Sequence, residues 1–266
     1  MTDGYPRRIV CLTEETTETL YLLGEEDRIV GISGFTVRPP RARREKPKVS
    51  AFTRANIPRI LELQPDLVLG FSDLQADIAA ELIRAGVPVH VFNQRTVEQI
   101  LDAILTLGAL VGARDRAERL VADLRAGLAE IGRQAAELPR RPRVWFEEWD
   151  DPLIGGIGWV AELVELAGGE ECFPELRGRG LARDRIVDPT EVARRAPDLV
   201  IASWCGKRFR PERVRARPGW ETVPAVRDGE LHEVPASEIL SPGPAALTDG
   251  VRRLHDIVRR WAARRA

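Results

Sequence analysis

Short apolar runs alternate with amphipathic stretches along most of this 266-residue chain. Runs rich in β-branched residues, such as 8–12, 28–32 and 66–69, are typical of buried strands, whereas 73–86 repeats its apolar positions with helical spacing. Strands that alternate with helices of this length predict mostly parallel sheets covered on both faces. The predicted fold class is therefore α/β.

One supersecondary unit occurs twice in the chain. It reads helix, then Pro-Asp-Leu-Val, then strand, first at RILELQPDLVLG (59–70) and again at EVARRAPDLVIA (191–202). The repeat predicts two Rossmann-like lobes with mostly parallel sheets, joined by a long helix, with a ligand cleft between them. We place the N-terminal α/β lobe at 1–112, the connecting helix at 113–138 and the C-terminal α/β lobe at 139–266.

Capping patterns predict where several helices begin. Thr96 with Gln99, and Asp115 with Glu118, have the spacing of capping boxes, so the proline-free stretch between the lobes is divided into two helices. The second helix is expected over 116–136 and, at 1.5 Å per residue, is about 30 Å long. For the first helix of the chain, Thr16 or Thr17 is the expected cap.

The composition is that of a soluble globular protein. Hydrophobic residues make up 44% and charged residues 30%, and 40 basic residues nearly balance 41 acidic ones. Basic clusters at 38–46 and 206–217 lack a nucleic-acid motif and interleaved aromatic residues, so we expect them to be solvated surface. No nucleic-acid partner is expected.

The start of the chain and its hydropathy bear on location. No apolar run near the start resembles a signal peptide, and no stretch approaches the length that spans a membrane. We therefore expect a cytoplasmic protein without a membrane partner. Cys11, Cys172 and Cys205 are too widely spaced for a disulfide framework or a zinc pattern.

The residues just after each predicted strand are the candidates for ligand contact, because open parallel sheets bind ligands outside the carboxyl ends of their strands. Aromatic side chains recur at these places, as Phe35, Phe52, Phe71, Trp149 and Trp204. They suggest a large, flat, partly apolar ligand with carboxylates and hydroxyls along its polar rim. Phe52 and Phe71 are equally compatible with ordinary core positions.

Catalytic chemistry does not assemble from the sequence. Glu147 and Glu148 are neighbours on a strand and should point to opposite faces, while Asp150 and Asp151 are expected in a polar turn. The three histidines are expected within strands or on the last helix, away from the strand ends, at His90, His232 and His255. We expect no metal site, no phosphate loop and no catalytic cofactor. The pattern is typical of a binding protein rather than an enzyme.

Several segments resemble one known family. RIVCLTEETTETLYLLG (8–24) is similar to the opening strand and helix of the cobalamin- and siderophore-binding class of ABC-transporter substrate-binding proteins. The similarity continues through IPRILELQPDLVLG (57–70), Val164–Gly169, APDLVIA (196–202) and the Ser-Pro-Gly-Pro at 241–244. It covers almost the whole chain, and the vitamin B12-binding branch looks closest.

The resemblance implies a ligand and a set of contact residues. It implies that Phe35 and Phe52 lie against the corrin of a cobalamin ligand, with Trp149, Trp204 and Glu238 contributing from the other lobe. Cobalt in such complexes need not be ligated by the protein, so the resemblance requires no histidine. Phe71 and Cys205, which also follow strands, complete the predicted ligand-binding set.

The chain departs from the family at two positions. Transporter-linked members carry a glutamate seven residues before the proline of each Pro-Asp motif, and these glutamates dock on arginines of the permease. Here the positions are Pro58 and Thr190. Glu62 and Glu191 lie nearby, but a helix turns its side chains by about 100° per residue. Docking to an ABC permease is therefore not expected.

Two other functions stay open from the sequence. The same aromatic residues suit haem or an iron–siderophore complex, since any large planar ligand fits such walls. The chain is also compatible with an enzyme that modifies a cofactor of this kind, with Cys205, Lys207 or Glu148 as the reactive group.

Overall fold

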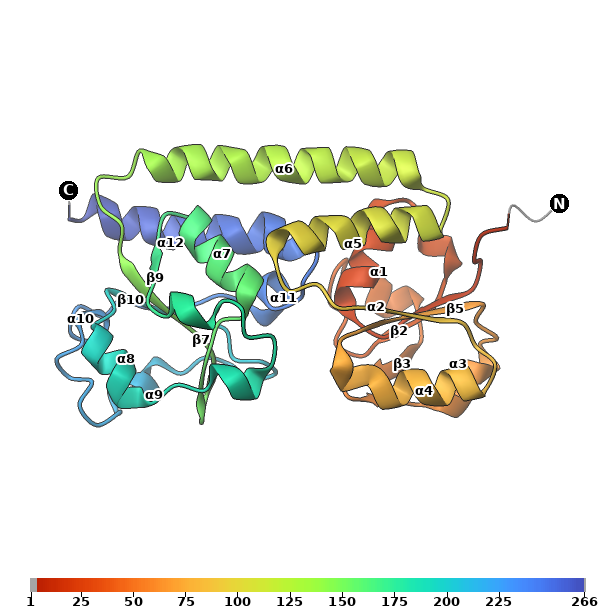
Figure 1. Ribbon diagram of the computed structural model, residues 1–266, viewed down its shortest axis with the longest axis horizontal. Coiled ribbons are helices and arrows are strands. Elements are labelled where there is room, and N and C mark those ends of the chain that lie inside the picture. The colour runs from red at the N-terminus through yellow and green to blue at the C-terminus, as the bar shows by residue number, and fades with distance from the viewer. Residues whose placement is uncertain (1–3, 266) are drawn as a thin grey trace. The chain divides into compact units, whose positions relative to one another are not determined.

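The computed structural model describes residues 4–265. The outer ends of the two predicted lobes, residues 1–3 and 266, lie outside the described residues, and with them the very start of the chain. The chain divides into two compact units: the first comprises residues up to Gln94 and Glu98–Asp123, the second Arg95–Val97 and the chain from Leu124 onward. Each unit has its own parallel-rich sheet (Figure 1), and the chain passes from one to the other within a long helix. The predicted fold class is confirmed.

The first unit contains a six-stranded sheet in the order β4-β3-β2-β1-β5-β6. All neighbouring strands are parallel except β3 and β4, which form an antiparallel pair. The strands are β1 (Ile9–Cys11), β2 (Ile29–Ser33), β3 (Lys48–Ala51), β4 (Arg54–Ala55), β5 (Leu67–Phe71) and β6 (Val89–Phe92). The helices are α1 (Glu14–Leu22), α2 (Ala42–Glu45), α3 (Ile57–Glu62), α4 (Ala76–Arg84), α5 (Val97–Leu110) and the first half of α6 (Arg114–Ala136).

Alternation along the strands builds the core of the first unit. Val10 and Val68 point to one face of the sheet and pack there with Ile60 of α3 and Leu82 of α4. Figure 1 shows α3 and α4 on this face, and α1 and α5 on the other. The apolar stripe of α5 is buried, as expected for a helix that covers a sheet: Ile100, Ile104, Leu107 and, just after the helix, Val111.

The second unit contains a five-stranded sheet in the order β11-β10-β7-β8, with β9 paired to β7. The strands are β7 (Arg143–Asp150), β8 (Leu153–Gly155), β9 (Glu170–Glu171), β10 (Leu199–Ala202) and β11 (Leu231–Glu233), and only β8 is antiparallel to its neighbour. The helices are α7 (Gly158–Leu166), α8 (Pro189–Arg195), α9 (Pro211–Arg215), α10 (Pro224–Arg227), α11 (Ala236–Ile239) and α12 (Val251–Ala263).

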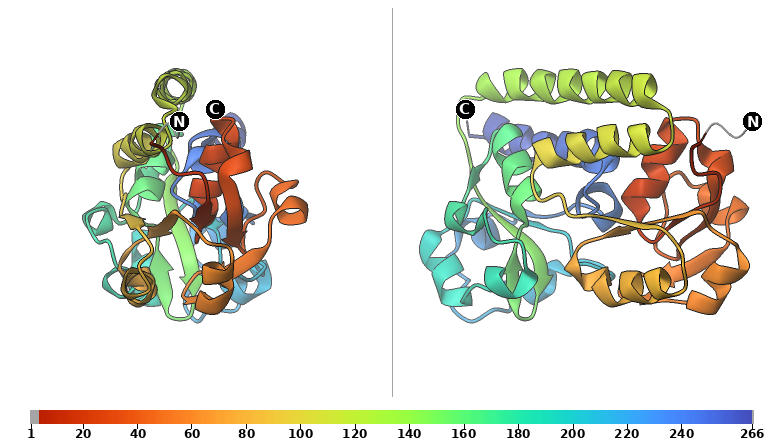
Figure 2. Two further views of the ribbon diagram at one scale, coloured as in Figure 1. Left: turned by 90° about the vertical axis from the view of Figure 1, so that its right-hand side faces the viewer. Right: turned by 45° about the vertical axis from the view of Figure 1, so that its right-hand side comes forward.

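Helices cover both faces of the second sheet as well. Trp145 and Val200 pack with Val192 of α8, Val214 of α9 and Ala225 of α10. The other face carries α7 and α12, which contact each other (Figure 2). The apolar stripe of α12 is buried, at Leu254, Ile257, Val258 and Trp261.

The repeated Pro-Asp motif has the same structural role in both units. The carboxylate of Asp66 accepts hydrogen bonds from the backbone N–H groups of Arg7 and Arg8, at 2.7 and 2.8 Å, just before β1. The carboxylate of Asp198 accepts one from the N–H of Arg143 at the start of β7, at 2.9 Å. Each aspartate thus satisfies an N–H at the amino end of the neighbouring central strand, which explains why the same residue follows proline in both copies.

Two predicted helix starts are wrong. Thr13, with extended backbone, is the residue before α1, so Thr16 and Thr17 lie inside the helix, where both hydroxyls donate to the Thr13 carbonyl oxygen. The helix begins earlier because β1 already ends at Cys11. Likewise α6 begins at Arg114, which places Asp115 in the first turn, where a carboxylate is favoured by the helix dipole without being the cap.

Close packing of α5 on α6 requires glycine at position 108. A Cβ added there would lie 2.3 Å from the Cβ of Ala117, whereas one added at Gly127 of α6 would meet nothing within 4 Å. We expect Gly108→Ala to lower the free energy of unfolding by about 1–3 kcal/mol, because the helices must move apart.

Gly127→Ala is the matched control and should raise the free energy of unfolding by about 0.5–1 kcal/mol, from helix propensity alone. Urea unfolding of both variants measures the difference. A Gly108→Ala variant as stable as the parent would contradict the packing argument.

Candidate functional site

The carboxyl ends of the strands in the first unit carry three of the predicted ligand residues. Phe35, after β2, has 51% of its surface exposed, and Phe52, after β3, is partly buried. Phe71 is the last residue of β5 and is buried. An accessible aromatic ring therefore lies at the end of β2, while the ring of Phe71 is in the core. The place of all three in a ligand site stays a prediction.

A buried glutamine joins two of these strand ends. The side chain of Gln75 donates from Nε2 to the carbonyl oxygen of Phe52 at 2.8 Å and accepts at Oε1 from the N–H of Phe71 at 2.9 Å. Because both bonds are buried or partly buried, breaking them would leave polar groups unsatisfied. Gln75 thus fixes the spacing of Phe52 and Phe71, a role that no sequence pattern indicated.

Glu15 is a buried carboxyl group at the start of α1, next to the end of β1. Burial raises the pKa of Glu15 to about 8, and the nearby Glu14 and Glu18 push it in the same direction, while a 2.5 Å hydrogen bond from Thr13 Oγ1 lowers it. Glu18 itself pairs with Arg38 at 2.8 Å. Glu15 is therefore largely protonated at neutral pH, which its position after a strand alone did not reveal.

In the second unit, the fully buried carboxylate of Glu147 organises the carboxyl ends of β7 and β10. It accepts two hydrogen bonds from the guanidinium of Arg217, both at 2.7 Å. It also accepts from the indole N–H groups of Trp145 and Trp204, at 2.9 and 3.0 Å. Four donors satisfy this carboxylate, as a charge removed from water requires.

The predicted polar turn is present at Asp151 and Pro152, with Asp151 exposed, but it does not include Asp150. Asp150 is the last residue of β7, and its side chain is only 2% exposed. It forms ion pairs with Lys207 and, at 2.7 Å, with Arg213. The two cations, which come from the segment after β10, compensate the buried charge of this carboxylate. Because that segment is distant in sequence, no local pattern identifies it as the partner of Asp150.

Lys207 brings together two of the predicted ligand residues. Its ammonium lies 3.8 Å from the ring centroid of Trp149 and 5.1 Å from that of Trp204. Trp149 is partly exposed, whereas Trp204 is buried and packs edge-on against Phe209. Arg213 belongs with them, because its guanidinium lies 5.8 Å from the ring centroid of Trp204. We refer to Trp149, Trp204, Asp150, Lys207 and Arg213 as the indole cluster.

Cys205 and Glu238 complete the predicted set in this unit. Cys205 is exposed in the turn between Trp204 and Lys207, and it is not in a disulfide. Glu238 lies on α11, where Arg253 donates to its carboxylate at 2.7 Å. Within residues 4–265, the side-chain hydrogen bonds of Glu238 join it to Arg253 rather than to the indole cluster. The ligand role of both residues, and the ligand cleft itself, stay predictions.

Two of the residues named as reactive groups for an enzyme, Glu148 and Lys207, form ion pairs. Glu148 accepts from the buried guanidinium of Arg185 at 2.6 Å, while Lys207 pairs with Asp150. Glu147 and Glu148 thus bind different arginines, as predicted for neighbours on a strand. Burial raises the pKa of the Cys11 thiol to about 12, so this cysteine is a poor nucleophile at neutral pH.

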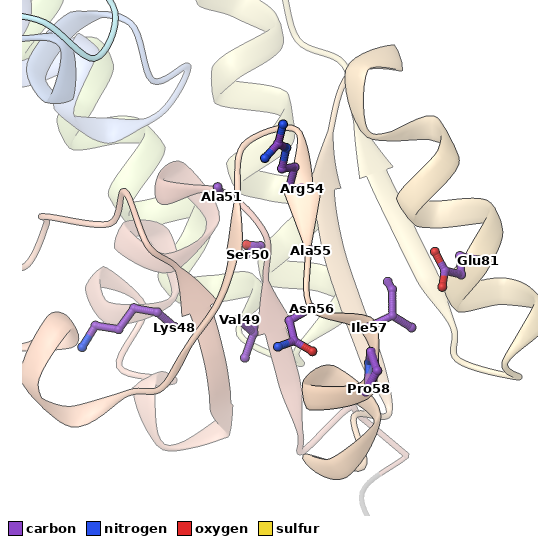
Figure 3. Close-up of a pocket in the computed structure, with 10 residues that line it drawn as sticks. All are labelled: Lys48, Val49, Ser50, Ala51, Arg54, Ala55, Asn56, Ile57, Pro58 and Glu81. Carbon is purple, nitrogen blue, oxygen red and sulfur yellow. The ribbon is translucent and has the colours of Figure 1, made fainter.

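A surface depression of the first unit lies beside β3 and β4, and Figure 3 shows Arg54 on that hairpin and Glu81 on the neighbouring helix. Its volume is about 670 Å³, and its lining residues are Lys48, Val49, Ser50, Ala51, Arg54, Ala55, Asn56, Ile57, Pro58 and Glu81. A second depression, of about 330 Å³, lies along β6 and α5. Neither is lined by a predicted ligand residue.

Two of the histidines lie close to oxygen atoms of other residues. His255 Nδ1 lies 3.0 Å from the carbonyl oxygen of Ala167, and His232 Nε2 lies 2.9 Å from a carboxylate oxygen of Glu230. Within residues 4–265, no group of three or more His, Cys, Asp or Glu side chains is arranged to hold a metal ion. In the same part of the chain, no helix has the length and apolarity to cross a membrane.

Comparison with known families gives one match. The sequence model of the family described as periplasmic binding protein matches residues 9–238, which is most of the chain. The match begins at β1 and ends on α11, so it includes the central strands of both units.

Two of the sequence relatives have names that describe binding proteins. An uncharacterised ABC transporter substrate-binding lipoprotein of Bacillus subtilis is 24% identical over 95% of this chain and 80% of its own length. A vitamin B12-binding protein of Vibrio campbellii is 26% identical over 76% of this chain and 72% of its own length.

Solved structures share the fold. A periplasmic vitamin B12-binding protein of Vibrio cholerae has a TM-score of 0.76 at 22% identity and covers 96% of this chain and 98% of its own. A periplasmic haem-binding protein of Pseudomonas aeruginosa has a TM-score of 0.82 at 22% identity, with 97% and 94% covered. At this identity the likeness shows the fold alone.

Removal of the Glu147 charge should destabilise the second unit. In Glu147→Gln the guanidinium of Arg217 stays buried without a carboxylate, so we expect a loss of about 3–5 kcal/mol in the free energy of unfolding. Glu62→Gln is the control, because Glu62 forms an exposed pair with Arg59 at 2.7 Å and should cost at most about 1 kcal/mol. Urea unfolding measures both, and equal effects would refute the special role of Glu147.

The raised pKa of Glu15 predicts a pH-dependent stability. Since the folded pKa of about 8 lies above the ordinary value of 4.5, this group's contribution is fully present below pH 4.5 and is lost as pH rises to about 8. Because glutamine does not ionise, the Glu15→Gln variant does not lose this contribution to stability as pH rises. The variant should therefore match the parent at pH 5 and exceed it at pH 9, by an amount on the order of a few kcal/mol.

Unfolding titrations of parent and variant at the two pH values measure this difference. If the gap between the two proteins is the same at pH 5 and pH 9, Glu15 does not carry a raised pKa in the folded protein.

Proposed function

Because this chain belongs to the periplasmic binding protein family, we propose that it binds a corrinoid, specifically cobalamin, without catalysing a reaction on it. The observation that carries the proposal is the presence of accessible aromatic rings at the carboxyl ends of strands in both units. Phe35 supplies such a ring in the first unit and Trp149 in the second. Parallel sheets bind ligands at these ends, and aromatic rings suit a flat macrocycle.

Relatives support cobalamin as the ligand. The Vibrio campbellii protein, named as a vitamin B12-binding protein, aligns with three quarters of this chain, and a solved vitamin B12-binding protein shares its fold. Haem is the second candidate, because a solved haem-binding protein has the same fold with a TM-score of 0.82. Both ligands are large, planar and metal-centred.

The proposal includes no docking on a permease through paired glutamates. Pro58 and Thr190 stand at the two positions where the resemblance implies docking glutamates. The nearby Glu62 is paired with Arg59, and Glu191 accepts hydrogen bonds from Arg194 and Arg195 on its own helix. The cytoplasmic location expected from the sequence stays a prediction, and ligand binding does not depend on it.

Calorimetric titration with hydroxocobalamin and with haemin tests the ligand. We expect cobalamin to bind with a Kd of about 10 μM or tighter, equivalent to roughly −7 kcal/mol, and haemin to bind more weakly. The protein–cobalamin mixture should also co-elute with the red chromophore in gel filtration. Binding of haemin alone would favour the second candidate, and binding of neither would refute the proposal.

A pair of matched variants tests the place of binding. Phe35 is 51% exposed after β2, and Leu22 is 53% exposed at the last residue of α1, toward the opposite edge of the sheet. Phe35→Ala should weaken cobalamin binding by about three- to tenfold, the effect of one aromatic contact. Leu22→Ala removes a similarly exposed apolar side chain and should leave the Kd unchanged. Equal effects would exclude the strand ends of this unit.

A further inference from the structure

The charges of the indole cluster do not cancel. Lys207 and Arg213 both pair with Asp150, so two cations share one carboxylate. The Asp150 side chain is 2% exposed, whereas those of Lys207 and Arg213 are 32% and 49% exposed. The buried carboxylate holds the cations in place, and a ligand would meet the cations only. One positive charge is therefore left over at an accessible position.

The surrounding segment adds to this excess. Between Gly206 and Arg217 the sequence contains six basic residues and one acidic residue, Glu212. Arg217 is neutralised by Glu147, but Arg208, Arg210 and Arg215 are exposed, and no ion pair recorded for residues 4–265 includes them. Their field raises the local concentration of anions near the cluster.

The position of the lysine is fixed by the aromatic rings. Its ammonium lies over the faces of Trp149 and Trp204, at 3.8 and 5.1 Å from the ring centroids. Cation–π attraction and the ion pair together restrain a side chain that is otherwise flexible. A fixed cation thus lies directly beside the partly exposed indole of Trp149, which is a flat apolar surface.

We propose that Lys207 determines ligand specificity in the second unit by pairing with an anionic group of the bound ligand. The inference rests on the proposed function and names the feature of the ligand that this unit recognises. Cobalamin carries such a group, the phosphodiester of its nucleotide loop, whereas cobinamide has the same corrin ring without the loop. Lys207 thus favours corrinoids that carry the phosphodiester.

Titrations of cobalamin and dicyanocobinamide into the parent and into Lys207→Met test this. In the variant Arg213 still pairs with Asp150, so no buried charge is left alone. We expect cobalamin to lose about three- to fivefold in affinity and cobinamide less than twofold, the effect of one partly exposed ion pair. Lys207→Arg should keep most of the preference, because it keeps the charge.

Two controls separate a contact with the ligand from a structural role. Arg208→Met removes a neighbouring exposed charge and should change the two affinities equally and slightly. In the parent, raising the salt concentration should weaken cobalamin binding more than cobinamide binding, since the ion pair is screened. This measurement needs no variant and holds even where Lys207→Met folds poorly.

The outcomes are distinct. Equal losses for both ligands, or no loss for either, together with equal salt dependence, would overturn the role of Lys207 while leaving corrinoid binding in place. If the parent binds neither ligand, the proposed function fails and this inference fails with it.

Discussion

The fully buried carboxylate of Glu147 is the interaction on which the candidate site of the second unit depends. A charge inside a protein is tolerated only where donors replace its water, and here one guanidinium and two indole N–H groups do so. The bonds join β7 to the end of β10 and to Arg217, 70 residues further along the chain. They therefore fix both ends of the segment that contains Lys207 and Arg213, and with it the orientation of Trp204.

In the first unit, hydrogen bonds between neutral groups hold the carboxyl ends of the strands in place. The amide of Gln75 joins Phe52, just after β3, to Phe71 at the end of β5. The carboxyl of Glu15, whose pKa burial raises to about 8, lies beside Thr13 just after β1. Neutral hydrogen bonds avoid the free energy required to bury a charge, but they create no electrostatic preference at the surface. The two units thus differ in kind: one presents an exposed phenylalanine, the other an indole with an adjacent cation.

This difference suits a ligand with an apolar macrocycle and a polar periphery. Aromatic rings contact a flat ring system with little selectivity. The relatives and solved structures that resemble this chain have names that refer to vitamin B12 or to haem. To discriminate between such ligands, a site needs a charged side chain that stays unpaired when the ligand lacks the complementary group. The excess positive charge of the indole cluster is the feature of this chain that can supply it.

The sequence by itself determined the elements and the class of fold. Periodicity placed the strands and the main helices, and the repeated Pro-Asp motif indicated two similar lobes, because these signals depend on residues close together in the chain. It also placed Phe35 and Trp149 at strand ends. The ion pairs of Glu147 and Asp150 and the burial of Glu15 and Trp204 were decided only by the tertiary structure. Their partners or covering residues lie far away in sequence, for example 57 residues between Asp150 and Lys207, and no local pattern records which of many charges will meet.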